Sequence, residues 1–100
     1  MMHIVLYKFT VKNAQEDEFI TAWEALTKLI HSHEGSLGSR LHKEADGVFI
    51  AYAQWPSLES FDRAGERLPA EADGYRAAMR EACTSIETIH QMEVVKDLLV

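Results

Sequence analysis

The dipeptide Asp46-Gly47 sets the first limit on how this chain can fold. It lies between two stretches of strand-like residues, 37–44 and 48–55. Asp-Gly favours the tight turn of a β-hairpin, because glycine adopts positive φ angles at no steric cost. The two stretches are therefore predicted to be antiparallel neighbours in one sheet.

A strand and a long helix are predicted before this hairpin. Residues 3–11 alternate in strand fashion and are apolar on both faces, which indicates a strand that is covered on both sides. Asn13 and Glu16 have the spacing of a helix-capping pair. Apolar residues then recur at helical spacing, namely Phe19, Trp23, Leu26 and Ile30. A helix from about Ala14 to His33 is predicted.

A short helix, a second helix and a last strand are predicted after the hairpin. Pro56-Ser57 ends the second hairpin strand, and Ser57 can cap a short helix. Pro69 interrupts the helical stretch that follows, because proline lacks the N–H that a helix interior needs. The second helix is predicted from about Asp73 to Thr84, and the strand from Ile86 to Val95.

The order of these elements predicts a single α+β domain over residues 1–100. Two β-α-β units with right-handed crossovers give a ferredoxin-like βαββαβ fold, a four-stranded antiparallel sheet with the helices on one face. The other face stays uncovered and carries Ile4, Leu6, Ile50 and Tyr52. An apolar sheet face is normally hidden against a second copy, so a homodimer through the open sheet face is expected.

Charge and cysteine content narrow the partners and the compartment. The net charge is −6 and no basic run occurs, so nucleic acid is not an expected partner. No apolar run approaches membrane-spanning length and the first residues lack the signal-peptide pattern, so no membrane association is expected. Cys83 is the only cysteine, which excludes an internal disulfide and favours a cytoplasmic location.

The histidines and the cysteine lack the spacing of a metal site. His31 and His33 lie two residues apart near a helix end, so they point in different directions and are expected to be solvated. His90 lies on the last predicted strand. It is interpreted either as a general base or as a half-buried strand residue without a catalytic role. Cys83 is expected to be a packed side chain rather than an activated thiol. No metal and no cofactor are predicted.

The aromatic residues suggest a ligand pocket. Trp55 stands at the end of its strand, where the indole can wall a pocket and place its N–H on a ligand. Ala51 and Ala53, on the same face, leave space beside it. The other aromatic and sulfur-containing side chains expected around that face are Tyr7, Phe9, Phe49, Phe61, Tyr75 and Met79. The alternative is that these rings form the core and that the alanines only let a helix approach closely.

The segment Tyr52-Ala53-Gln54-Trp55-Pro56-Ser57-Leu58-Glu59-Ser60-Phe61 resembles the antibiotic biosynthesis monooxygenase family. In that family the third strand typically ends in an aromatic residue, Gln or Glu, Trp, any residue and Ser. Glu34-Gly35-Ser36-Leu37-Gly38 resembles the family's passage from helix to strand, and the order of elements matches over nearly the whole chain. The resemblance implies a dimeric α/β barrel of ferredoxin-like subunits, each with a pocket between sheet and helices.

Departures from the family affect the expected chemistry. Ala51 stands where the most similar polyketide oxygenases carry an asparagine, and Phe61 replaces their tyrosine. The late helix reads Tyr75-Arg76-Ala77-Ala78-Met79, without the histidine that a haem-degrading member needs. Haem is therefore not expected.

The resemblance implies a cofactor-independent monooxygenase that acts on a small aromatic or quinol-like substrate. Tyr7 and His90 are the expected catalytic residues, because they could assist proton transfer. The expected substrate contacts are Trp55, Phe61, Ala51 and Met79. The alternative is a non-catalytic homodimer that binds a small aromatic ligand, which the missing asparagine and tyrosine favour.

Overall fold

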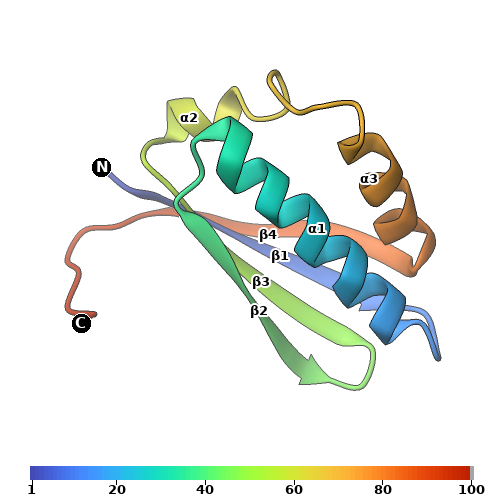
Figure 1. Ribbon diagram of the computed structural model, residues 1–100. Helices are drawn as coiled ribbons and strands as arrows, with labels where there is room; N and C mark the ends of the chain where they lie inside the picture. The colour runs from blue at the N-terminus through green and yellow to red at the C-terminus, as the bar shows by residue number, and fades with distance from the viewer. Residues whose placement is uncertain (100) are drawn as a thin grey trace.

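The helices and strands follow one another in the predicted order. The computed structural model describes residues 1–99, and its elements are β1 (His3–Val11), α1 (Glu16–Glu34), β2 (Gly38–Ala45), β3 (Val48–Trp55), α2 (Leu58–Asp62), α3 (Ala72–Glu81) and β4 (Cys83–Glu93). Within these residues the strands form one four-stranded antiparallel sheet in the order β2-β3-β1-β4, and the helices lie on one face of it (Figure 1). The ferredoxin-like α+β fold is confirmed.

The hairpin between β2 and β3 turns where Asp46-Gly47 predicts it. Gly47 has a φ of 74°, which is the left-handed conformation that the tight turn needs. The Gly47 carbonyl accepts a hydrogen bond from the backbone N–H of Val11 at 2.7 Å. The hairpin is therefore tied to the end of β1, the central strand that it pairs with.

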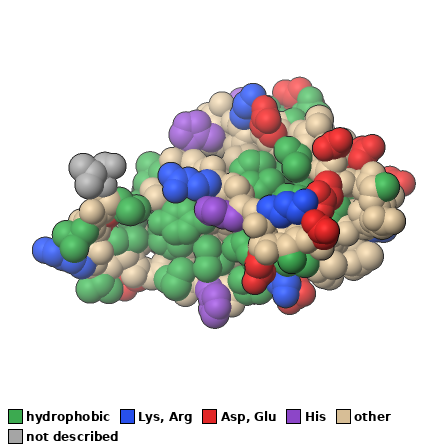
Figure 2. Space-filling model, turned by 90° about the horizontal axis from the view of Figure 1, so that it is seen from below, with side chains coloured by type: hydrophobic (Ala, Val, Ile, Leu, Met, Phe, Trp, Pro, Cys, Tyr) green, Lys and Arg blue, Asp and Glu red, His purple; other side chains and the backbone are tan. Residues whose placement is uncertain are grey.

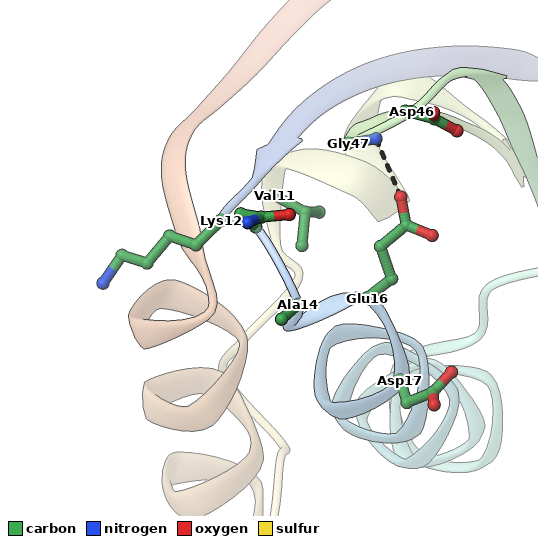
Figure 3. Close-up of a pocket in the computed structure, with 8 residues that line it drawn as sticks. Val11, Lys12, Ala14, Glu16, Asp17, Asp46 and Gly47 are labelled. Atoms are coloured by element: carbon green, nitrogen blue, oxygen red, sulfur yellow. Dashed lines mark hydrogen bonds between the residues drawn. The ribbon is translucent and has the colours of Figure 1, made fainter.

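The start of α1 differs from the prediction. Asn13 does not cap the helix, since Gln15 occupies the N-cap position and makes no side-chain capping bond. The carboxylate of Glu16 instead accepts a hydrogen bond from Gly47 N–H at 2.7 Å (Figure 3). It also accepts one from Lys43 Nζ at 2.9 Å. Because both oxygens are engaged by the hairpin, Glu16 cannot close the predicted capping pair.

The junction of α3 and β4 also differs from the prediction. α3 ends at Glu81 rather than Thr84, and β4 starts at Cys83 rather than Ile86. Cys83 pairs with Val11 at the end of β1, and Lys12 N–H donates to the Ala82 carbonyl at 2.8 Å. These contacts come from residues far away in the chain, so local helical spacing does not reveal them. Ser57, in contrast, caps α2 as predicted, because its side chain accepts a hydrogen bond from Ser60 N–H at 3.1 Å.

The core lies between the sheet and the helices. Phe19, on α1, is fully buried, and its ring centroid lies 4.9 Å from that of Phe9 and 5.2 Å from that of Phe49. Tilted aromatic pairs at such distances add to the stabilisation that burial provides. The other buried members of this cluster are Val11, Ala51, Ala82 and Cys83. This cluster fills the half of the layer that adjoins the start of α1.

The opposite face of the sheet carries no helix, and the view of it shows apolar side chains together with histidine, basic and acidic ones (Figures 1 and 2). Leu6 pairs with Tyr52 on one side and with His90 on the other, and laterally paired residues share a face. Within residues 1–99 no helix is long and apolar enough to cross a membrane.

Candidate functional site

A largely apolar cavity of about 220 Å³ lies between α1, the sheet and α3. It occupies the half of the helix–sheet layer that the aromatic core leaves open. The residues that line it are Tyr7, Phe9, Trp23, Leu26, Thr27, Ile30, Ser36, Ser39, Ala53, Trp55, Arg76, Met79 and Ile86. The volume is below the roughly 300–1,000 Å³ of most ligand pockets, so it suits a small and flat molecule.

Helical and strand periodicity explain why these residues converge. On α1, Trp23, Thr27 and Ile30 follow one another at spacings of four and three, so they lie on the same side of the helix. On β3, Ala53 and Trp55 are two residues apart and point to the helix side of the sheet. Because the side chain of Ala53 is small, it leaves room for the cavity at this position.

Trp55 lines the cavity and carries a buried polar group. Its side chain is almost fully buried, at 4% exposure, and among residues 1–99 its indole Nε1 has no hydrogen-bond partner. A buried donor without a partner costs about 1–3 kcal/mol, so such groups are rare in folded proteins. An oxygen atom on a bound molecule would satisfy this donor.

Tyr7 is the second polar group. Burial raises the pKa of its phenol above the usual value of 10.0, because the charged form would lose its solvation. Tyr7 therefore stays protonated at neutral pH. It can donate a hydrogen bond to a ligand oxygen, but it is a poor general base.

Arg76 is the one charged residue among the described residues that line the cavity. Its guanidinium lies 3.9 Å from Asp73, which is a long and exposed contact, so most of its hydrogen-bonding capacity is free for a ligand. Arg76 was not among the predicted site residues. Arg76 stands three residues before Met79, and residues at i and i+3 share a helix face. Since Met79 was a predicted substrate contact, this spacing could have indicated that Arg76 also lines the cavity.

The structure brings some of the expected site residues together and separates others. Tyr7, Trp55 and Met79 line the cavity. Ala51 is buried beside Phe9 in the aromatic core and does not reach the cavity. Phe61 packs behind Trp55, with ring centroids 5.7 Å apart. His90 is exposed and pairs with Leu6, which places it on the opposite face of the sheet.

A second hollow, more open, lies at the start of α1 (Figure 3). Glu16, Asp17 and Asp46 line it, but Glu16 is already occupied by Gly47 and Lys43. No group of three or more His, Cys, Asp or Glu residues among residues 1–99 is arranged to hold a metal ion. The apolar cavity is therefore the better candidate site.

Comparisons with known proteins agree with this fold. The model of a family described as antibiotic biosynthesis monooxygenase matches residues 2–81. A mutant of SnoaB, a cofactor-independent oxygenase from Streptomyces nogalater, is 20% identical with a TM-score of 0.78, over 97% of this chain and 96% of that chain. No curated protein matches the sequence.

Two further solved structures have similar folds. A candidate antibiotic biosynthesis monooxygenase from Caulobacter crescentus is 22% identical with a TM-score of 0.75, over 95% of this chain and 91% of that chain. Another, from Chloroflexus aurantiacus, is 15% identical with a TM-score of 0.78, over 97% and 96%. At these identities the likeness shows the fold alone.

Proposed function

Because this chain belongs to the antibiotic biosynthesis monooxygenase family, we propose that it is a cofactor-independent oxygenase of a one-ring or two-ring hydroxyarene. The observation that carries the proposal is the small apolar cavity whose wall includes Tyr7, Trp55 and Arg76. SnoaB, which has a similar fold, is a cofactor-independent oxygenase. The small volume of the cavity favours a one-ring or two-ring substrate.

The proposed reaction uses electrons from the substrate itself. A hydroxyarene such as 1-naphthol gives four electrons to O₂, and one oxygen atom becomes the carbonyl at C4. The O–H and C4–H hydrogens leave with the second oxygen atom as water, so 1,4-naphthoquinone forms. The protein excludes water from the ring and holds it in one orientation beside O₂.

Each polar group has a role that follows from its charge. The guanidinium of Arg76 stabilises the arenolate, which is the form that transfers an electron to O₂ most readily. The N–H of Trp55 and the hydroxyl of Tyr7 donate hydrogen bonds to substrate oxygens. Tyr7 acts as a donor because burial keeps its phenol protonated. We assign no role to His90, because it pairs with Leu6 on the opposite face of the sheet.

The alternative function, binding of an aromatic ligand without turnover, also has an observation in its favour. Among the described residues that line the cavity there is no histidine, aspartate or glutamate. No ordinary general base therefore faces the ligand, and a substrate would have to ionise with only Arg76 to assist it.

Oxygen uptake in the presence of 1-naphthol separates the two functions. We expect uptake of O₂ in equal amount to the 1,4-naphthoquinone formed, with one atom from ¹⁸O₂ in the product. Tight binding of 1-naphthol without uptake would support the alternative. Neither binding nor uptake of 1-naphthol, phenol or hydroquinone would contradict both.

We also propose that two copies associate through the open sheet face. Leu6, Ile50 and Tyr52 lie there without a covering helix, whereas Ile4, which was also expected on this open face, is buried at 4% exposure. The C-terminal segment beyond β4 exposes Leu98 and Leu99, at 80% and 81%. Apolar side chains exposed to this extent favour burial against a second copy.

A further inference from the structure

Glu34, the last residue of α1, is buried although it is charged. It is only 1% exposed. Its Oε2 accepts a hydrogen bond from Gly65 N–H and its Oε1 accepts one from Arg67 N–H, each at 2.7 Å. The guanidinium of Arg67 donates to the Glu34 backbone carbonyl at 3.2 Å. Two converging backbone N–H groups form a site for a negative charge, and here the carboxylate fills it.

These bonds are the attachment of the loop between α2 and α3. In residues 1–99, the hydrogen bonds that join residues 63–71 to any element other than α2 and α3 all end on Glu34. The C-terminal end of α3 has a separate anchor, because Ala82 and Cys83 are buried in the core. The N-terminal half of α3 is held by the loop and by its first residue, Ala72, which is fully buried.

The position of α3 sets the width of the cavity. Arg76 and Met79 on α3 face Trp23, Thr27 and Ile30 on α1 across it. Release of the loop from Glu34 removes one of the two attachments at the start of α3, and the burial of Ala72 remains as the other.

We propose that Glu34 is a positioning residue for the site, which holds α3 against α1 and so fixes the place of Arg76. The proposal rests on the proposed function only for the identity of the ligand. Glu34 is not among the residues that line the cavity, and its carboxylate acts through the loop. It needs both oxygens, since each accepts a separate N–H.

Glu34→Gln tests this requirement with almost no change in shape. One carboxylate oxygen becomes an NH₂ group that faces a backbone N–H, so one bond is replaced by a contact between two donors. Loss of a charge-assisted hydrogen bond changes an equilibrium by about tenfold or more. We expect hydrogen exchange at the amides of Gly65, Arg67 and Arg76 to accelerate by about that factor, while the amide of Val5 in the sheet stays protected.

Release of 1-naphthol, followed by stopped-flow fluorescence well below the melting temperature, gives the second measurement. Release should be about tenfold faster in Glu34→Gln. Glu24→Gln is the matched control, because it removes the same charge from the same helix at an exposed pair with Lys28. It should change neither measurement. A purely structural role of Glu34 would lower the melting temperature and leave the release rate unchanged, which would overturn the proposal.

A second variant covers the case in which Glu34→Gln does not fold. Gly65 has a φ of +102° with open space around it, so Gly65→Ala strains the loop backbone without touching α1. It should accelerate exchange at Arg67 and Arg76 as well. If the unmodified protein does not bind 1-naphthol, the proposed function fails, but exchange at Arg76 still decides the role of Glu34. Unchanged exchange at Arg76 in either folded variant would show that Glu34 does not position α3.

Discussion

The ring of Phe61 meets the indole of Trp55 edge to face, with ring centroids 5.7 Å apart and 64° between the planes. On its other side, Phe61 lies 5.7 Å from the ring of His3. His3 is held in turn by a 3.0 Å hydrogen bond between its Nε2 and Gln91. Trp55 is therefore supported from behind by a row of packed rings, and its orientation at the cavity wall does not depend on a ligand.

The first prediction concerns the unpartnered N–H of Trp55. Trp55→Phe keeps an aromatic ring and removes the donor, so the affinity for 1-naphthol should fall by about two- to tenfold, the value of one neutral hydrogen bond. Isothermal calorimetry measures this without relying on tryptophan fluorescence, to which Trp23 contributes. Phe61→Leu is the control, because it weakens the packing behind Trp55 and keeps the indole N–H of Trp55. A fall in melting temperature with unchanged affinity in Trp55→Phe would mean that Trp55 is only core.

A second prediction follows from the raised pKa of Tyr7. Its folded-state pKa is above the unfolded value, so burial of the neutral phenol contributes stability that is complete below about pH 10 and is lost as pH rises through the folded pKa. Absorbance at 295 nm should show a tyrosine ionisation above the usual pKa of 10.0. Tyr7→Phe should remove that late step and reduce the loss of stability above pH 10. A late step that persists in Tyr7→Phe would assign it to Tyr52 or Tyr75.

The sequence predicts the elements of this protein better than the joins between them. Alternation in residues 3–11 and the turn at Asp46-Gly47 are local signals, and both elements form as predicted. The predicted start of α1 and the predicted end of α3 were wrong, because Glu16 and Ala82 form hydrogen bonds with segments distant in the chain.

The candidate site shows the same division. Trp55 belongs to the segment that resembles the family, and it lines the cavity. The sequence does not show which face of the sheet His90 occupies, and His90 lies on the face opposite the cavity. A register shift in the pairing of β1 with β4 lies between Leu6 and Tyr7, next to the partner of His90. Such an irregularity moves later residues to the other face, and strand alternation in the sequence cannot show it.

A third prediction concerns backbone strain before α1. Ala14 has a φ of 64°, where a residue with a Cβ is disfavoured by about 1–2 kcal/mol. Ala14→Gly should therefore increase the free energy of unfolding by about 1 kcal/mol after the entropy cost of glycine, measured by urea denaturation. Ala77→Gly, in the middle of α3, is the same substitution in a helix and should instead lower it by about 1 kcal/mol. A loss of stability in Ala14→Gly would show that this conformation is not strained.

A fourth prediction tests the proposed dimer. Light scattering at micromolar concentration should give about twice the chain mass of 11.4 kDa. Leu6→Asp places a charge in the middle of the open sheet face and should yield monomers, because an unpaired charge is costly to bury. Ile20→Asp, on an exposed position of α1, should leave the mass unchanged. A monomeric unmodified protein, or a dimer that survives Leu6→Asp, would count against this interface.

The last prediction concerns Arg76 as the counter-charge of a bound arenolate. Arg76→Gln removes the charge and keeps a hydrogen-bonding group on a shorter side chain. Because its side chain is 36% exposed, the loss is reduced by solvent screening, and we expect affinity for 1-naphthol to fall by about five- to tenfold at neutral pH.

The pH dependence distinguishes a charge effect from a packing effect. In the unmodified protein, affinity should increase as the pH approaches the ionisation of 1-naphthol, because the anionic ligand interacts more strongly with the guanidinium. In Arg76→Gln this increase should disappear. Arg80→Gln is the matched control, since Arg80 lies one turn further along α3 and outside the cavity, and its profile should follow that of the unmodified protein. Identical pH profiles for both variants would mean that Arg76 does not bind the anion, and the electrostatic part of the proposed mechanism would then be wrong.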